Sequence, residues 1–219
     1  MSLKLFGYYL VEISPKPDWI DINSPKILTV SKCLGTLHPL LEGCFYINQA
    51  KNHKNYQKSL KLDDAKFADL KKAVNTLYEQ QKIDFDSRFQ HYQDARTFYE
   101  NYLYQLENIK IVALAVEEQN TDSLLNELAD STHAFLLPED NVIEGELLGY
   151  DILGYEFDFC HSYLCNGLDK EISQHFTLRV NELGLIQNAY AEVDAFAHHI
   201  KEMGEPVLWL PFAIYDCSK

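Results

Sequence analysis

Three short, almost wholly apolar runs constrain the fold of this chain most strongly: LKLFGYYLVEI at 3–13, IKIVALAV at 109–116 and VLWLPFAIY at 207–215. Runs of this length without polar alternation are too short to span a membrane and are typical of strands buried on both faces of a sheet. Pro211 lies inside the last run and cannot donate a ladder hydrogen bond, so we expect that strand at an edge or at a bulge.

Further strands are predicted at 27–34, where a short helix is the alternative, and at 43–48, 133–137 and 147–157. The segment 109–137 reads as strand, helix (120–129) and strand, which favours a right-handed parallel crossover and therefore a mixed sheet. The strand at 147–157 contains the repeat LGYD and LGYE. Its glycines favour a bulge, and its odd period places Tyr150 and Tyr155 on opposite faces of a regular strand.

Two helices are expected in succession. The first runs from a cap at Asp63 or Asp64 to about residue 81, and the second, 85–106, carries aromatic and leucine side chains at alternating steps of four and three. Together they predict a long aromatic-rich helical hairpin over about 63–107. Arg96 interrupts the apolar stripe, so either it lies over neighbouring rings and reaches solvent, or it contacts an anion or a partner.

Helices are also expected at 159–176 and 185–201. No Gly/Ser-rich linker divides the chain, which favours a single α+β domain, residues 1–219, with a mixed sheet packed against several helices. A division near residue 108, into 1–107 and 108–219, is the alternative.

Charge is distributed unevenly along the chain. Residues 1–82 contain 12 lysines and 8 acids, whereas residues 83–219 contain 7 lysines and arginines and 25 acids, for a net charge of −14. No lysine or arginine lies between Lys110 and Lys170, and 117–158 contains 12 carboxylates. Such a surface repels nucleic acid and anionic membranes and attracts a basic protein, although it could also act only as a solubilising face.

The N-terminal residues lack the features of a signal peptide, and five cysteines at irregular spacing suit a reducing compartment better than a disulfide framework. We therefore expect a cytoplasmic protein that binds neither nucleic acid nor membranes, as a monomer or a homodimer.

The stretch FCHSYLCNGLDKE at 159–171 places two cysteines and a histidine close together. On a helix, Cys160 falls outside the apolar stripe that contains His161 and Cys165, and too few ligands converge for zinc. Asp194 and His198, four residues apart, resemble half of a metal site, but a surface ion pair explains them equally well. Hydrolase, P-loop and dinucleotide motifs are absent. We predict no metal and no cofactor.

Two hypotheses about function lead, and a structural or oligomerisation module built on the tyrosine-rich helix 85–106 is a third possibility. The first is a non-catalytic binding protein, in concrete form an immunity-type inhibitor of a basic toxin enzyme, whose acidic surface docks on its partner. Its expected contact residues are Glu117, Glu118, Asp122, Glu127, Asp130, Glu139, Asp140, Glu144 and Glu146, with Tyr150 or Tyr155 as anchors. The second is a small hydrolase or transferase that uses Cys160 or Cys165 with a histidine such as His161, His175, His198 or His199.

Overall fold

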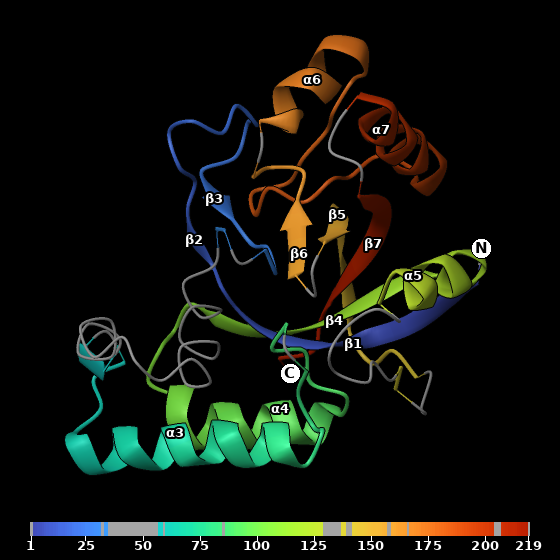
Figure 1. Ribbon diagram of the computed structural model, residues 1–219. Coiled ribbons are helices and arrows are strands. Elements are labelled where there is room, and N and C mark those ends of the chain that lie inside the picture. The colour runs from blue at the N-terminus through green and yellow to red at the C-terminus, as the bar shows by residue number, and fades with distance from the viewer. Residues whose placement is uncertain are drawn as a thin grey trace.

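The computed structural model describes residues 2–31, 33–34, 57–58, 60–84, 86–128, 137–138, 142–156, 159–165, 167–203 and 207–218. Its centre is a curled five-stranded sheet in the order β1-β4-β7-β5-β6, with helices on both sides (Figure 1). The strands are β1 (Leu3–Glu12), β4 (Ile109–Glu117), β5 (Glu146–Glu156), β6 (Phe159–Ser162) and β7 (Leu208–Asp216). The α+β class is therefore confirmed. Every pairing among these strands is antiparallel, whereas the sequence predicts a mixed sheet.

The three apolar runs form β1, β4 and β7, as predicted, but β7 lies in the middle of the sheet. It pairs with β5 along its length and with β4 only from Phe212 to Asp216. Pro211 therefore lies just beyond the end of the β4 ladder, where a missing backbone donor leaves no gap in that ladder. The edge position expected from this proline is wrong for the strand as a whole.

β5 has the predicted irregularity, because its register to β7 shifts between Leu147 and Gly149. Tyr150 and Tyr155 lie beyond the shift and face opposite sides, toward different hydrophobic clusters.

The helix expected from Phe159 is wrong over its first half. Residues 159–162 form β6, which pairs with β5, and α6 (Leu168–His175) begins only after Gly167 in a left-handed conformation (φ 72°). Apolar residues recur at helical spacing along this segment, although it is a strand, a turn and a short helix in succession. Periodicity alone does not distinguish this arrangement from one continuous helix.

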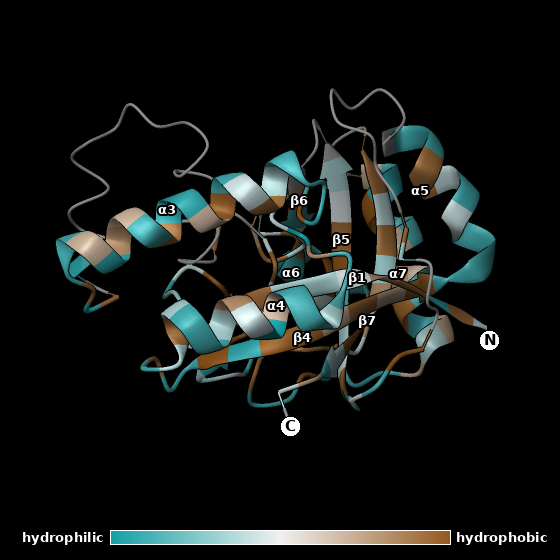
Figure 2. Ribbon diagram, turned by 90° about the horizontal axis from the view of Figure 1, so that it is seen from below, coloured by the Kyte–Doolittle hydropathy of each residue, from teal (hydrophilic) through white to brown (hydrophobic). Residues whose placement is uncertain are grey.

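Two helices cover one face of β1 and β4. α3 (Asp64–Glu79) begins at the predicted cap, where the Asp63 carboxylate accepts a hydrogen bond from the backbone of Lys66. α4 (Tyr92–Phe98), continued by the π-helical turn η1 (Tyr99–Leu103), lies beside it (Figures 1 and 2). The apolar side of this pair faces Leu5, Tyr8, Leu10, Ile109 and Ile111 of the sheet.

The second helix of this pair is shorter than the range 85–106. Phe89 forms backbone bridges to Tyr8 and Ile83, so the chain before α4 is extended. In this segment Arg88 is fully buried: its Nε donates to Asp84 at 2.7 Å and its guanidinium lies over the Phe6 ring.

The opposite side carries η2 (Glu118–Asn120), α5 (Thr121–Leu128), α6 and α7 (Tyr190–Met203). α7 begins later than residue 185, because Ile186 bridges to Tyr150 and Val180. The expected strand at 27–34 is limited to β3 (Lys26–Ile27), which pairs with β2 (Ser14–Pro15). Residues 43–48 and 133–136 lie outside the described residues. Within the described chain, no helix is both long enough and apolar enough to cross a membrane.

Candidate functional site: an acidic cleft beside the first helix turn of α4

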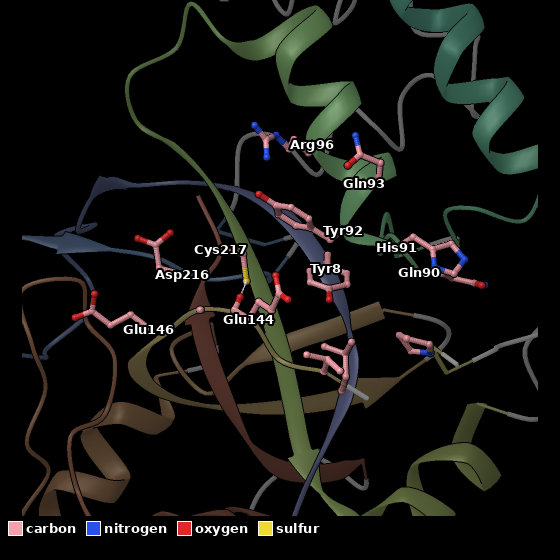
Figure 3. Close-up of a pocket in the computed structure, with 14 residues that line it drawn as sticks. Tyr8, Gln90, His91, Tyr92, Gln93, Arg96, Glu144, Glu146, Asp216 and Cys217 are labelled. Carbon is pink, nitrogen blue, oxygen red and sulfur yellow. Dashed lines mark hydrogen bonds between the residues drawn. The ribbon is translucent and has the colours of Figure 1, made fainter. Parts of the chain in front are cut away.

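A cleft of about 1090 Å³ opens between the start of α4 and the segment that leads into β5 (Figure 3). It is formed by β1, the turn before α4, residues 142–146 and the end of β7. Its lining residues are Leu5, Tyr8, Gln90, His91, Tyr92, Gln93, Arg96, Pro138, Val142, Glu144, Gly145, Glu146, Asp216 and Cys217. This volume is in the range of small-ligand and side-chain binding sites.

Two tyrosines form the aromatic part of the cleft. Tyr8 and Phe89 exchange two backbone hydrogen bonds, of 2.9 and 2.8 Å, which fix the turn before α4 against β1. Tyr92 in the first turn of α4 is thereby held near Tyr8, with ring centroids 5.8 Å apart and planes at 55°. Tilted rings at this separation present electron-rich faces, which attract cations as well as apolar groups.

The acidic wall comes from the end of the segment before β5 and from the first residue of β5. Glu144 and Glu146, both expected from the sequence to contact a partner, are exposed there. The thiol of Cys217 donates to the backbone oxygen of Glu144 at 2.8 Å, and the Cys217 amide donates to Ile111, so this wall is attached to the sheet. Burial raises the pKa of the Cys217 thiol to about 11, which keeps it protonated and able to donate.

Asp216 lines the cleft but is already paired. Burial alone would raise its pKa, but hydrogen bonds from Lys110 Nζ and from Ser218 outweigh this and hold the pKa below its usual value. Asp216 is therefore ionised at neutral pH and its charge is balanced by Lys110. The exposed carboxylates of Glu144 and Glu146 give the cleft its negative character.

Arg96 lies on the wall opposite these glutamates, where its Nε donates to Glu100 at 2.8 Å. Its side chain is half exposed and lies near Tyr92 (Figure 3). The interpretation of Arg96 as an arginine beside a ring that reaches solvent fits this position, and its charge is matched by Glu100.

The other expected contact residues lie elsewhere or outside the described chain. Glu118, Asp122 and Glu127 are exposed on η2 and α5, and Glu117 is half-buried at the end of β4. Tyr150 is half-buried and packs edge-on against Tyr190, with ring centroids 5.7 Å apart. Asp130, Glu139 and Asp140 lie outside the described residues.

Tyr155 does not fit the expected role of a surface anchor. Its side chain is 2% exposed and packs against Phe6 and Phe212 in the core. The face of β5 that carries it is covered by β1 and β7 side chains, because the sheet curls. Tyr92, which the sequence places only in an apolar stripe, takes the surface position instead.

The cysteine candidates are also placed differently from the expectation. Cys160 is fully buried on β6, and its thiol donates to the backbone oxygen of Val30 at 3.4 Å. Cys165 contacts Ser31 Oγ at 2.7 Å, and burial raises its pKa to about 12. Neither thiol is suited to act as a nucleophile near neutral pH.

Among the described cysteines, Cys33 contacts a histidine: its Sγ lies 3.6 Å from Nδ1 of His161 at the surface. Strand geometry explains the pair, because consecutive residues of β6 alternate: Cys160 points into the core and His161 points away from it. Spacing along the sequence gives no signal for this contact, since Cys33 comes from a distant segment. His175 lies on α6, where it contacts Glu171 and His199.

One buried carboxyl group is held by hydroxyl side chains. Asp151 of β5 accepts hydrogen bonds from Thr29 Oγ1 at 3.0 Å and Ser162 Oγ at 2.8 Å. Burial raises the pKa of Asp151 to about 7, and these two hydroxyl donors limit the rise.

Searches against protein-family models, curated proteins and solved structures found no match to this chain.

Proposed function

We propose that this protein is a non-catalytic binding protein whose acidic cleft receives a basic segment of a protein partner. The observation that carries the proposal is the combination of the Tyr8 and Tyr92 rings with the exposed carboxylates of Glu144 and Glu146 in one cleft. Lysine and arginine side chains bind best where an aromatic face and a carboxylate are both within reach.

The acidic residues outside the cleft support the same proposal in a different way. Glu118, Asp122 and Glu127 on η2 and α5 are exposed, and no lysine or arginine lies between Lys110 and Lys170 in the sequence. Charges at this distance act mainly on the rate of encounter rather than on the final contact. A concrete form of the proposal is an immunity-type inhibitor that covers a basic toxin enzyme, because fast electrostatic capture serves such an inhibitor well.

Binding of a fluorescent lysine- and arginine-rich peptide to the full chain tests the proposal, with a glutamine-substituted peptide of the same length as the reference. The double variant Glu144→Gln/Glu146→Gln should weaken binding about tenfold, since two contacts of under 1 kcal/mol each are lost. Tyr92→Leu should weaken it by about threefold to tenfold through loss of the ring face.

Asp122→Asn/Glu127→Gln is the matched control, because it removes the same charge from α5. It should lower the association rate and change the dissociation rate little. Equal affinity for the two peptides, or equal losses of affinity in the two double variants, would contradict the proposal.

A second candidate function is thiol chemistry at Cys33, and it is favoured by the contact of 3.6 Å with His161. An imidazole at this distance can act as a general base toward the thiol when it attacks a substrate. Cys33 should then react with iodoacetamide at pH 7 at least about tenfold faster than a free cysteine, and His161→Ala should abolish the difference. A rate equal to that of free cysteine would remove this candidate.

A further inference from the structure

α6 and α7 pack against each other on the side of the sheet opposite α3 and α4 (Figure 1). Three ligand-type side chains meet at their contact. Glu171 and His175 lie four residues apart on α6, and His199 comes from α7. His175 Nε2 lies 3.0 Å from Glu171 Oε1, and His199 Nε2 lies 3.6 Å from the same oxygen.

The three side chains can direct one atom each to a common point. Their candidate ligand atoms all lie within 4.8 Å of one another, and the two imidazole centroids are 4.7 Å apart. In a tetrahedral zinc site with bonds of 2.0–2.1 Å, neighbouring ligand atoms lie about 3.3 Å apart. Two of the distances already bracket this value, and small rotations about side-chain bonds suffice to bring the third ligand atom to it.

The surroundings of His199 provide an independent observation. Its Nε2 is buried and has no hydrogen-bond partner within the described structure, since the Glu171 oxygen is beyond hydrogen-bond distance. Its ring packs edge-on against Phe176, which in turn packs on Phe196. A buried ring nitrogen without a hydrogen-bond partner destabilises the folded state, and a metal ion at the centre of the group would satisfy it.

We infer that Glu171, His175 and His199 form a binding site for a divalent transition-metal ion of the zinc class. Two imidazole nitrogens and one carboxylate oxygen suit such an ion, whereas magnesium and calcium prefer oxygen ligands alone. Phe176 closes the site on the core side. The half-exposed His175 faces solvent, so a fourth coordination position is open to water.

The site does not depend on the proposed cleft, which lies on the other side of the sheet. Its structural effect is local. α6 has only eight residues and begins after Gly167. Because the helix is so short, only a few of its side chains contact α7. An ion held by both helices would fix them together, and the folded state would gain stability with metal concentration by mass action.

The test uses the full chain without a histidine tag, stripped of metal with a chelator. Zn²⁺ should bind in a 1:1 ratio by calorimetry and raise the melting temperature. Co²⁺ in its place should give visible absorption bands of the intensity that four-coordinate cobalt shows. Mg²⁺ at the same concentration should do neither.

His175→Gln and His199→Gln should each weaken Zn²⁺ binding at least about tenfold. Replacing a residue that only hydrogen-bonds to a metal ligand already costs roughly this much affinity. His198→Gln is the matched control, because His198 neighbours His199 on α7 but is exposed and bonds to Asp194. It should retain full affinity. Circular dichroism checks that each variant is folded. His175 is half exposed, so we expect His175→Gln to fold normally.

Two results would overturn the inference: no 1:1 binding of Zn²⁺ to the stripped protein, or binding that His198→Gln weakens as much as His175→Gln. The second would place the ion on the surface pair of His198 and Asp194. Contacts among the three side chains alone, with no ion bound, would give the first result.

Discussion

The side chain of Arg88 crosses directly over Gly7 of β1: a methyl group on Gly7 would lie 2.6 Å from Cγ of Arg88 and 2.7 Å from its Cδ. Gly7 also has a φ of 154°, a backbone conformation that residues other than glycine rarely adopt. The buried Arg88 side chain therefore occupies the space that a side chain at position 7 would need. The apolar strand β1 packs against a cation at this point.

Gly7→Ala should lower the free energy of unfolding by at least about 3 kcal/mol, because it combines backbone strain with overlap against Arg88. Urea denaturation measures this. Gly167→Ala is the matched control, since Gly167 has a φ of 72° with nothing within 4 Å of the added methyl group. It should cost only the strain, about 1–2 kcal/mol. Equal losses in the two variants would show that Arg88 does not lie over Gly7.

Two arginine–carboxylate pairs differ mainly in burial and allow a direct comparison. Arg88–Asp84 spans 2.7 Å with the arginine fully buried, and Arg96–Glu100 spans 2.8 Å with both partners about half exposed. Asp84→Ala should destabilise by about 3–5 kcal/mol, because the buried guanidinium loses a carboxylate partner. Glu100→Ala should leave the unfolding midpoint nearly unchanged, since exposed pairs are screened by water. A large effect of Glu100→Ala would contradict this contrast.

Asp151 should make stability depend on pH in a specific window. Its pKa rises from 3.8 to about 7 on folding, so the folded state holds its proton in the range where the unfolded chain has lost it. Its contribution is therefore most favourable below pH 4 and is lost as the pH rises to about 7, by roughly 4 kcal/mol in total. Above pH 7 the penalty is constant.

Asp151→Asn keeps the shape of Asp151 but does not titrate: its amide oxygen can accept from one of the two hydroxyls, and its amide nitrogen can donate to the other. The difference in unfolding free energy between the variant and the natural sequence should increase in favour of the variant from pH 4 to pH 7. Thermal or urea denaturation at several pH values measures it. A difference that stays flat across this range would mean that Asp151 remains ionised in the folded protein.

Thiol accessibility should follow the positions of the four described cysteines. In a Cys44→Ser background, Cys33 should be labelled first, since it is exposed, and Cys165 much more slowly because its pKa is about 12. Cys160 and Cys217 are buried and should react only after unfolding. Mass spectrometry of timed samples gives the order. Early labelling of Cys160 would contradict its place in the core.

Elements with a strong local signal were predictable. The apolar runs of β1, β4 and β7 and the cap at Asp63 depend on neighbouring residues alone. β6 was not, because its strand state depends on pairing with β5 and its apolar spacing also fits a helix. The position of β7 was missed as well, since the effect of Pro211 depends on where the β4 ladder ends.

The candidate site was predictable only in part. Glu144 and Glu146 were identified because charge is a property of the sequence itself. Tyr92 and Tyr8 come together through the bridge of Phe89 to β1, and His175 and His199 through the packing of two helices. Such contacts arise from tertiary structure, and spacing within one element carries no information about them.

β7 follows all the other strands in the sequence but lies between β4 and β5 in the sheet. During synthesis, the pair β1–β4 and the pair β5–β6 therefore exist before the strand that joins them, and each presents an unpaired edge to the cell. β7 can pair with β4 and β5 and cover these two edges only after residues 208–216 have left the ribosome. Until that moment the slow formation of these non-local pairings prolongs the exposure of both edges, and a nascent chain halted before β7 would be most prone to aggregation.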